Sequence, residues 1–183
     1  MPDEIVSKVL DSAIETFKRQ ARMSEYQTNP KAWCKDVLGI DLWSKQEDMF
    51  NAILANDHTA VRSCHGSGKS FNAALVACWW AATHPIGDSI FVTTAPTYHQ
   101  VHSIIFENIR KFHTLARDRY EAGLSPMELP GYITQSDQWK SDSGVLIGFG
   151  RKPADNNDHG FQGIHRRYVL GIVTGKQIGR AHV

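Results

Sequence analysis

The chain has 183 residues, of which 42% are hydrophobic, so it has the size of one domain with a buried core. The mean hydropathy is −0.35, and no apolar run approaches the roughly 18 residues of a membrane-spanning helix. The N-terminus is acidic and has no signal-peptide pattern. These features predict a soluble, cytosolic protein with no membrane partner. The net charge of +1 excludes the large basic excess of non-specific DNA-binding proteins, and three cysteines without a CxxC spacing argue against a disulfide framework and a zinc finger.

The first 42 residues are predicted to form a helical region. Apolar residues recur at helical spacing over residues 5–22, with charged residues between them, which is typical of an amphipathic helix. Asn29 then has the character of a helix N-cap, with Pro30 at the first helical position. Gly39 is the expected end of that short helix.

Beyond residue 42 the pattern alternates between helix and strand. Ser44 and Glu47 have the spacing of a capping box, which predicts a helix that continues through Leu54. The elements expected next are a strand over 59–62, a helix over 71–83, a strand over 89–94, a helix from Thr97 to Phe112, and strands over 144–149 and from 168 onward. This order predicts an α/β fold with a parallel sheet flanked by helices. Residues 117–143 are rich in turn residues and are left unassigned.

A phosphate-binding loop is predicted between the first of these strands and the helix over 71–83. Glycines allow consecutive backbone N–H groups to turn toward an anion, a lysine reaches the outer phosphates, and a hydroxyl binds Mg²⁺. The helix that follows directs its positive end at the nucleotide. The predicted nucleotide-binding residues are Ser63, Cys64, His65, Gly66, Ser67, Gly68, Lys69 and Ser70, with Ser63 in place of the usual first glycine.

Gln46 is a further candidate for nucleotide binding. Its amide offers a donor and an acceptor together, which suits the edge of adenine. The alternative is a capped surface helix, and the nearby phosphate loop favours the adenine role. Two other sets of residues have simpler interpretations. His99 and His102 are three apart, which a solvated helix face explains better than a metal site, and Cys64 is either a reactive thiol or a small packing residue.

Four runs together resemble the ATPase domain of the large terminase subunit of a tailed bacteriophage. They are Trp43-Ser-Lys-Gln46, Val61-Arg-Ser-Cys-His-Gly-Ser-Gly-Lys-Ser70, Val92-Thr-Thr-Ala-Pro-Thr97 with Gln100-Val101, and Gly160-Phe-Gln-Gly-Ile-His165 with Tyr168-Val-Leu170. The first resembles the glutamine motif of that family, the second its deviant Walker A, the third the segment after the second core strand, and the fourth the approach to Walker B.

The resemblance implies a P-loop NTPase core of the RecA/ASCE type, incomplete at its C-terminus, and an ATP-driven motor that moves double-stranded DNA into a capsid. It implies ATP and Mg²⁺ as cofactors, with Gln46 at adenine, Lys69 as the catalytic residue at the β- and γ-phosphates, and Ser70 at Mg²⁺. The implied partners are double-stranded DNA, the small terminase subunit, the portal protein and further copies in a ring. The implied location is the host bacterial cytoplasm.

The C-terminal residues depart from the family. After Leu170 the family pattern continues through more apolar residues into an Asp-Glu pair, whereas residues 171–183 contain no carboxylate side chain. Residues 177–183 are what the codons CAG ATC GGA AGA GCA CAC GTC would encode, and that string resembles a sequencing-library adapter. Residues 171–183 are therefore predicted to be a non-native tail. The predicted organisation is therefore a helical region over 1–42, a partial P-loop ATPase core over 43–170, and this tail.

Because both acidic groups are missing, the chain is expected to bind ATP without hydrolysing it, with hydrolysis in the intact parent protein. Two alternatives remain open. One is a superfamily 2 helicase-like DNA-dependent ATPase, which shares a glutamine motif, a Walker A and an α/β core. The other is a nucleotide-binding regulator that never hydrolyses ATP.

Overall fold

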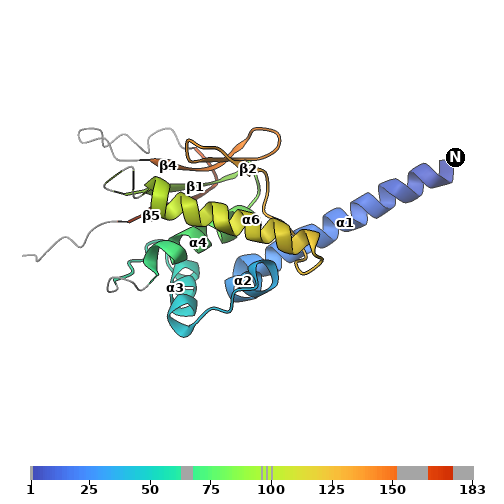
Figure 1. Cartoon of the computed structure of the whole chain (residues 1–183). Helices are drawn as coiled ribbons and strands as arrows, with labels where there is room; N and C mark the ends of the chain where they lie inside the picture. The colour runs from blue at the N-terminus through green and yellow to red at the C-terminus, as the bar shows by residue number, and fades with distance from the viewer. Residues whose placement is uncertain are drawn as a thin grey trace, which may run out of the picture.

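The computed structural model describes residues 2–62, 68–95, 97, 99, 101–151 and 165–174, which form a mixed α/β fold (Figure 1). The elements in chain order are α1 (Pro2–Thr28), α2 (Pro30–Leu38), α3 (Ser44–Ala55), α4 (Lys69–Thr83), β1 (Ser89–Thr94), the π-helical segment η1 (Val101–Phe106), α6 (Glu107–Glu121), β2 (Tyr132–Ile133), β3 (Gln138–Lys140), β4 (Leu146–Arg151) and β5 (Tyr168–Val173). None of the helices in these ranges is long and apolar enough to cross a membrane.

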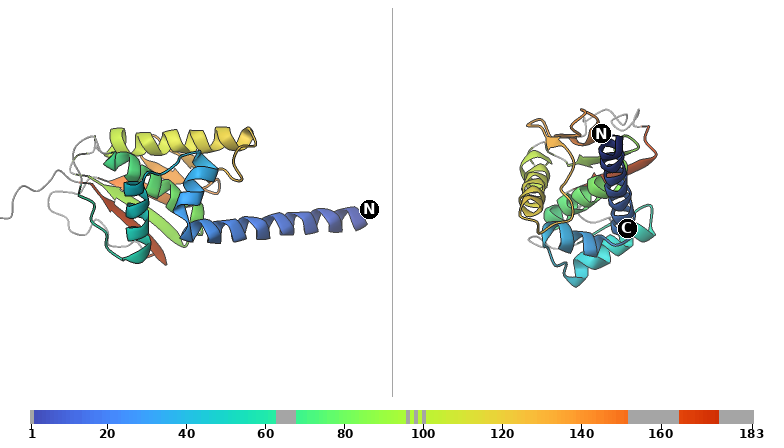
Figure 2. Two further views of the ribbon diagram at one scale, coloured as in Figure 1. Left: turned by 90° about the horizontal axis from the view of Figure 1, so that it is seen from below. Right: turned by 90° about the vertical axis from the view of Figure 1, so that its right-hand side faces the viewer.

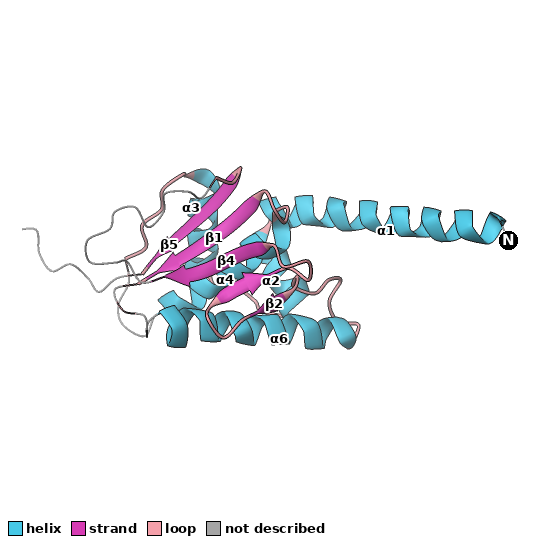
Figure 3. Ribbon diagram, turned by 90° about the horizontal axis from the view of Figure 1, so that it is seen from above, coloured by secondary structure: helices cyan, strands magenta, loops and turns pink. Residues whose placement is uncertain are grey.

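Five strands form one sheet in the order β2-β3-β4-β1-β5, seen face-on in Figure 3. β1 is parallel to both β4 and β5, whereas β2 and β3 are antiparallel to each other and β3 is antiparallel to β4. The prediction of a parallel sheet is therefore right for three strands and wrong for the other two. Short turns connect β2 to β3 and β3 to β4, and a short turn joins only antiparallel strands.

The predicted strand over 59–62 is also absent, because these residues are exposed and have no regular secondary structure. A strand is stable only when a neighbour satisfies its backbone N–H and C=O groups. β1 already pairs on both sides, with β4 and with β5. Residues 59–62 therefore have no place beside β1. The strand predicted over 89–94 has the same bounds in the structure, and β4 and β5 correspond to the strands expected near 144–149 and from 168.

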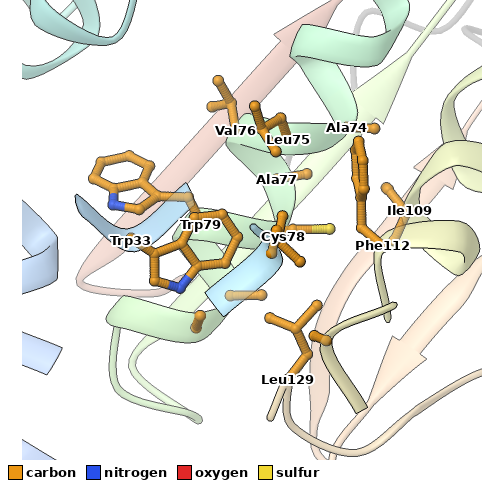
Figure 4. Close-up of a cluster of buried hydrophobic side chains, with 14 of the residues drawn as sticks. Trp33, Ala74, Leu75, Val76, Ala77, Cys78, Trp79, Ile109, Phe112 and Leu129 are labelled. Atoms are coloured by element: carbon orange, nitrogen blue, oxygen red, sulfur yellow. The ribbon is translucent and has the colours of Figure 1, made fainter. Parts of the chain in front are cut away.

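α4 is the central helix of the fold and contacts α1, α2, α6, η1 and β1. Its Trp79 is almost fully buried and lies edge-on to Phe50, with ring centroids 5.7 Å apart. The Trp79 indole Nε1 donates a hydrogen bond to the Tyr26 carbonyl oxygen at 2.8 Å, which ties α4 to the end of α1. Figure 4 shows how side chains of α4 gather with Trp33 and with residues of α6 in one cluster. The core therefore lies between α4 and the elements around it.

The predicted caps of α2 are confirmed. The Asn29 side chain accepts a hydrogen bond from the Ala32 backbone N–H, and Gly39 ends the helix with a φ of 68°. A side chain on Gly39 would also collide with Arg119, since a Cβ atom there would lie 2.6 Å from Nη1. Arg119 in turn donates through Nε to the Val37 carbonyl oxygen at 3.1 Å. Glycine at this position therefore lets α6 hold the end of α2.

His84, directly after α4, makes the stability of the fold depend on pH. Its ring stacks on Trp80 with centroids 3.6 Å apart, and burial lowers the pKa of the imidazole from 6.5 to about 4. Between these two pH values the unfolded chain binds the proton more readily than the folded chain. We therefore expect the free energy of unfolding to fall by at most about 1.4 kcal/mol per pH unit as the pH drops from 6.5 toward 4.

Urea denaturation at pH 7 and pH 5 measures this effect. His113 is a second histidine whose pKa burial lowers, so it contributes a loss of the same sign. In the variant His84→Phe, which keeps an aromatic ring beside Trp80, we expect a smaller difference between the two pH values. An unchanged difference in this variant would show that His84 does not cause the pH dependence.

Candidate nucleotide-binding site

The start of α4 contains the last three residues of the predicted phosphate-binding loop. Gly68 caps the helix with φ 77° and ψ 21°, in the left-handed region that favours glycine. Lys69 and Ser70 are the first two residues of the helix, where the backbone N–H groups and the helix dipole favour an anion. The other predicted loop residues, Ser63, Cys64, His65, Gly66 and Ser67, lie outside the described residues.

The topology places this helix start near the carboxyl ends of the parallel strands. α4 ends at Thr83, and after a connection of five residues the chain enters β1 at Ser89. The loop between them also meets the start of β5, because the Tyr168 backbone N–H donates to the Asp88 carbonyl oxygen at 3.0 Å. Since the end of α4 lies at the amino ends of β1 and β5, its start points toward their carboxyl ends. In open α/β sheets this edge is where ligands bind.

Gln46 lies against the first turn of α4. Its Nε2 donates to Oδ1 of Asn72 at 2.6 Å, across 26 residues of sequence, and both side chains are buried. The structure thus brings Gln46 beside the helix turn that begins with Lys69 and Ser70. The glutamine and the end of the predicted phosphate loop, which were predicted separately from the sequence, thus lie next to each other.

The Gln46 amide also caps its own helix. Its Oε1 accepts a hydrogen bond from the Trp43 backbone N–H at 3.2 Å, and Trp43 is the residue that precedes α3. The predicted capping box of Ser44 and Glu47 is therefore wrong by one position, because Ser44 is already helical. These two hydrogen bonds use one N–H and one lone pair of the amide, so one donor and one acceptor remain for a ligand.

Two threonines at the end of β1 add polar groups to this edge of the sheet. The Oγ1 atoms of Thr93 and Thr94 are buried, and neither has a hydrogen-bond partner within the described part of the chain. A buried hydroxyl without a partner costs about 1–3 kcal/mol. Such hydroxyls at a ligand-binding edge are candidates to meet a ligand or an ordered water. The sequence pointed to both threonines without assigning them a role.

A cluster that the sequence did not reveal lies beside the end of β4. Asp137 is fully buried, and its carboxylate lies 2.9 Å from Nδ1 of His102 and 2.8 Å from Nη2 of Arg110. His102, Arg110 and Gln135 line a surface depression of about 440 Å³. Asp137 also has a φ of 58°, and its carbonyl oxygen accepts from the Gly150 backbone N–H. The position of an aspartate in a run of turn residues was the only signal of this in the sequence.

The contacts of His102 in this cluster bear on whether His99 and His102 could bind a metal ion together. Its ring is bonded to Asp137, while Nδ1 of His99 lies 3.2 Å from Oγ of Ser103. Within the described residues, no group of three or more His, Cys, Asp or Glu side chains is placed to hold a metal ion.

Neither protein-family models, nor curated proteins, nor solved structures contain a match to this chain.

Proposed function

We propose that the chain is the ATP-binding motor domain of a viral DNA-packaging terminase, with a P-loop core of the RecA/ASCE type. The observation that carries the proposal is the start of α4. There a left-handed Gly68 precedes Lys69 and Ser70, and the buried hydrogen bond between Gln46 and Asn72 holds the glutamine against the same helix turn. The four sequence runs that resemble the large terminase subunit support the choice of this class of P-loop protein.

In the proposed site each residue has a separate task. Backbone N–H groups at the start of α4 hold the phosphates, and Lys69 supplies a positive charge at the outer two. The remaining donor and acceptor of the Gln46 amide contact adenine. Ser70 fits Mg²⁺ because its hydroxyl lies in the first turn, on an only partly buried residue. Mg²⁺ would neutralise charge on the phosphates.

We further propose that this chain holds ATP without hydrolysing it. β5 lies beside β1, as the strand before an acidic pair would, yet residues 168–183 contain neither Asp nor Glu. Without a carboxylate to support Mg²⁺ and to activate water, turnover is not expected. The same observation favours a second candidate function, a regulator that binds ATP and never hydrolyses it.

In the first proposal, the parent motor works in the bacterial cytoplasm on double-stranded DNA, with the portal and the small terminase subunit.

The test is the binding of Mg·ATP to the full chain by isothermal titration calorimetry. We expect Lys69→Ala to weaken binding at least about tenfold, because it removes the positive charge from the outer phosphates. The matched control is Lys111→Ala, which removes an exposed lysine of α6 that pairs with Glu107. Equal binding by wild type and Lys69→Ala, or no binding by folded wild type, would contradict the proposal.

A second measurement separates the motor from the regulator. A chain in which further apolar residues and then an acidic pair follow Leu170, as in the family pattern, should hydrolyse ATP faster when double-stranded DNA is present if the parent is a motor. ATP binding with no turnover in such a chain favours the regulator.

A further inference from the structure

A buried carboxylate holds a histidine and an arginine at the surface depression beside the end of β4. Asp137 is fully buried, whereas the side chains of His102 and Arg110 that it bonds are 41 and 32% exposed. Both of these side chains line the depression of about 440 Å³, together with Gln135. The depression therefore presents nitrogen groups to solvent, while the acid that orients two of them is inaccessible.

The backbone around this depression is unusual in two places. His102 lies in the π-helical segment η1, and such segments are rare and often found at functional sites. Among the described residues, Asp137 is the one non-glycine residue with a positive φ. Uncommon backbone conformations of this kind gather at ligand-binding sites.

Arg110 is held in place and still has hydrogen-bond donors for a ligand. Its Nη2 donates to the Thr134 carbonyl oxygen at 2.9 Å and to Oδ1 of Asp137 at 2.8 Å. Its Cζ lies 5.8 Å from the centre of the Phe106 ring. A guanidinium carries two further N–H groups on Nη1 and one on Nε, and these have no acceptor within the described part of the chain.

The local charge favours an anion. Asp137 balances the positive charge of Arg110, and Arg151 adds another positive charge at the end of β4. The residue before Arg151 donates its backbone N–H to the Asp137 carbonyl oxygen, so the two charges lie close in the fold. Glu107, one turn before Arg110 on α6, pairs with Lys111 at 2.7 Å, and this pair adds no net charge.

We propose that the depression binds a phosphate group. Guanidinium, imidazole and amide N–H groups are the donors that phosphate oxygens accept, and a guanidinium held in a fixed orientation suits them best. The volume lies in the range of ligand-binding pockets. The phosphate belongs either to a nucleic-acid backbone or to a free phosphate ion, and the chemistry of recognition is the same for both.

NMR of the full chain carrying Lys69→Ala tests the binding. This substitution weakens the proposed nucleotide site, so the result does not depend on the proposed ATP binding. Sodium phosphate, compared with sodium chloride at equal ionic strength and pH, should shift the imidazole signals of His102. The loss of these signals in His102→Gln identifies them. We expect the shift to saturate at millimolar phosphate, as is usual for a small ion on a few donors.

Substitutions at Gln135 separate a binding site from a purely structural cluster, because Gln135 is exposed in the turn between β2 and β3. Gln135→Glu should weaken phosphate binding at least about fivefold, the effect of one unit charge a few ångströms away in water. Gln135→Lys should strengthen it by a similar factor. The matched control is Gln20→Glu on α1, which should leave the affinity unchanged. α1 extends away from the rest of the fold with its apolar side exposed (Figures 1 and 2).

Fluorescence anisotropy of a short labelled DNA duplex identifies the source of the phosphate. If the phosphate belongs to a nucleic acid, the duplex binds and both substitutions at Gln135 change its affinity in the directions given above. If the ligand is a free ion, sodium phosphate shifts the His102 signals and the duplex does not. The proposal is overturned if neither probe shifts these signals, or if Gln135→Glu and Gln20→Glu have equal effects.

Discussion

Replacing Trp79 with alanine is expected to lower the free energy of unfolding by about 3–5 kcal/mol, the usual loss for a buried aromatic side chain. Trp79 is 2% exposed and belongs to the cluster of buried side chains in Figure 4. The substitution removes the edge contacts with Phe50 and with His84 and leaves a cavity. It also removes the donor to the buried Tyr26 carbonyl oxygen, so the attachment of α1 should loosen.

Urea denaturation followed by circular dichroism measures this loss, and Trp43→Ala is its control. Trp43 is 54% exposed and precedes α3, so its removal should change the free energy of unfolding by less than about 1 kcal/mol. A small effect at Trp79, similar to that at Trp43, would mean that α4 is not the central helix of a packed core.

Asp137→Asn is expected to destabilise the protein by about 2–3 kcal/mol. The substitution keeps the shape of the side chain, and asparagine tolerates the left-handed backbone of this residue as well as aspartate does. The charge is therefore the main change. Arg110 would face a neutral amide at the site where it now meets a fully buried carboxylate at 2.8 Å. Losing one partner of a buried ion pair costs up to about 3–5 kcal/mol, and the one-third exposure of Arg110 reduces that figure.

The matched control is Asp142→Asn, since Asp142 is exposed in the turn between β3 and β4. We expect it to change stability by less than about 0.5 kcal/mol. Hydrogen exchange adds a local readout, because loss of the Asp137 bonds should release the β2–β3 hairpin from η1 and α6. Equal protection of the hairpin in both variants would show that the buried carboxylate does not hold it.

Local signals in the sequence predicted local structure well. The caps at Asn29 and Gly39, and the bounds of the strand over 89–94, depend on residues next to each other in the chain. The failures have a different origin. Residues 59–62 have the composition of a strand, but a strand also needs a neighbour that satisfies its backbone groups, and these residues pair with none of the described strands. β2 and β3 lie in a region rich in turn residues, where hydrophobic residues recur with neither helix nor strand spacing. Their antiparallel pairing was therefore not predicted.

The candidate site divides in the same way. The motif itself marked Lys69 and Ser70, and the chemistry of an amide marked Gln46. No pattern along the chain indicated that Asn72 would bond to Gln46, because that contact joins residues 26 positions apart. The cluster of Asp137, His102 and Arg110 was missed for the same reason, since its members come from a turn and two helical segments.

The sequence by itself determined the α/β class, the caps of α2, the apolar character of α4 and the position of a glycine-lysine-serine run before it. Each of these depends on spacing or on backbone preference within a few residues. Only the tertiary structure decided which strands have partners, which buried carboxylate meets which cations, and that the apolar face of α1 lies outside the core. These outcomes depend on which distant segments come together, and burial and pairing are properties of that arrangement.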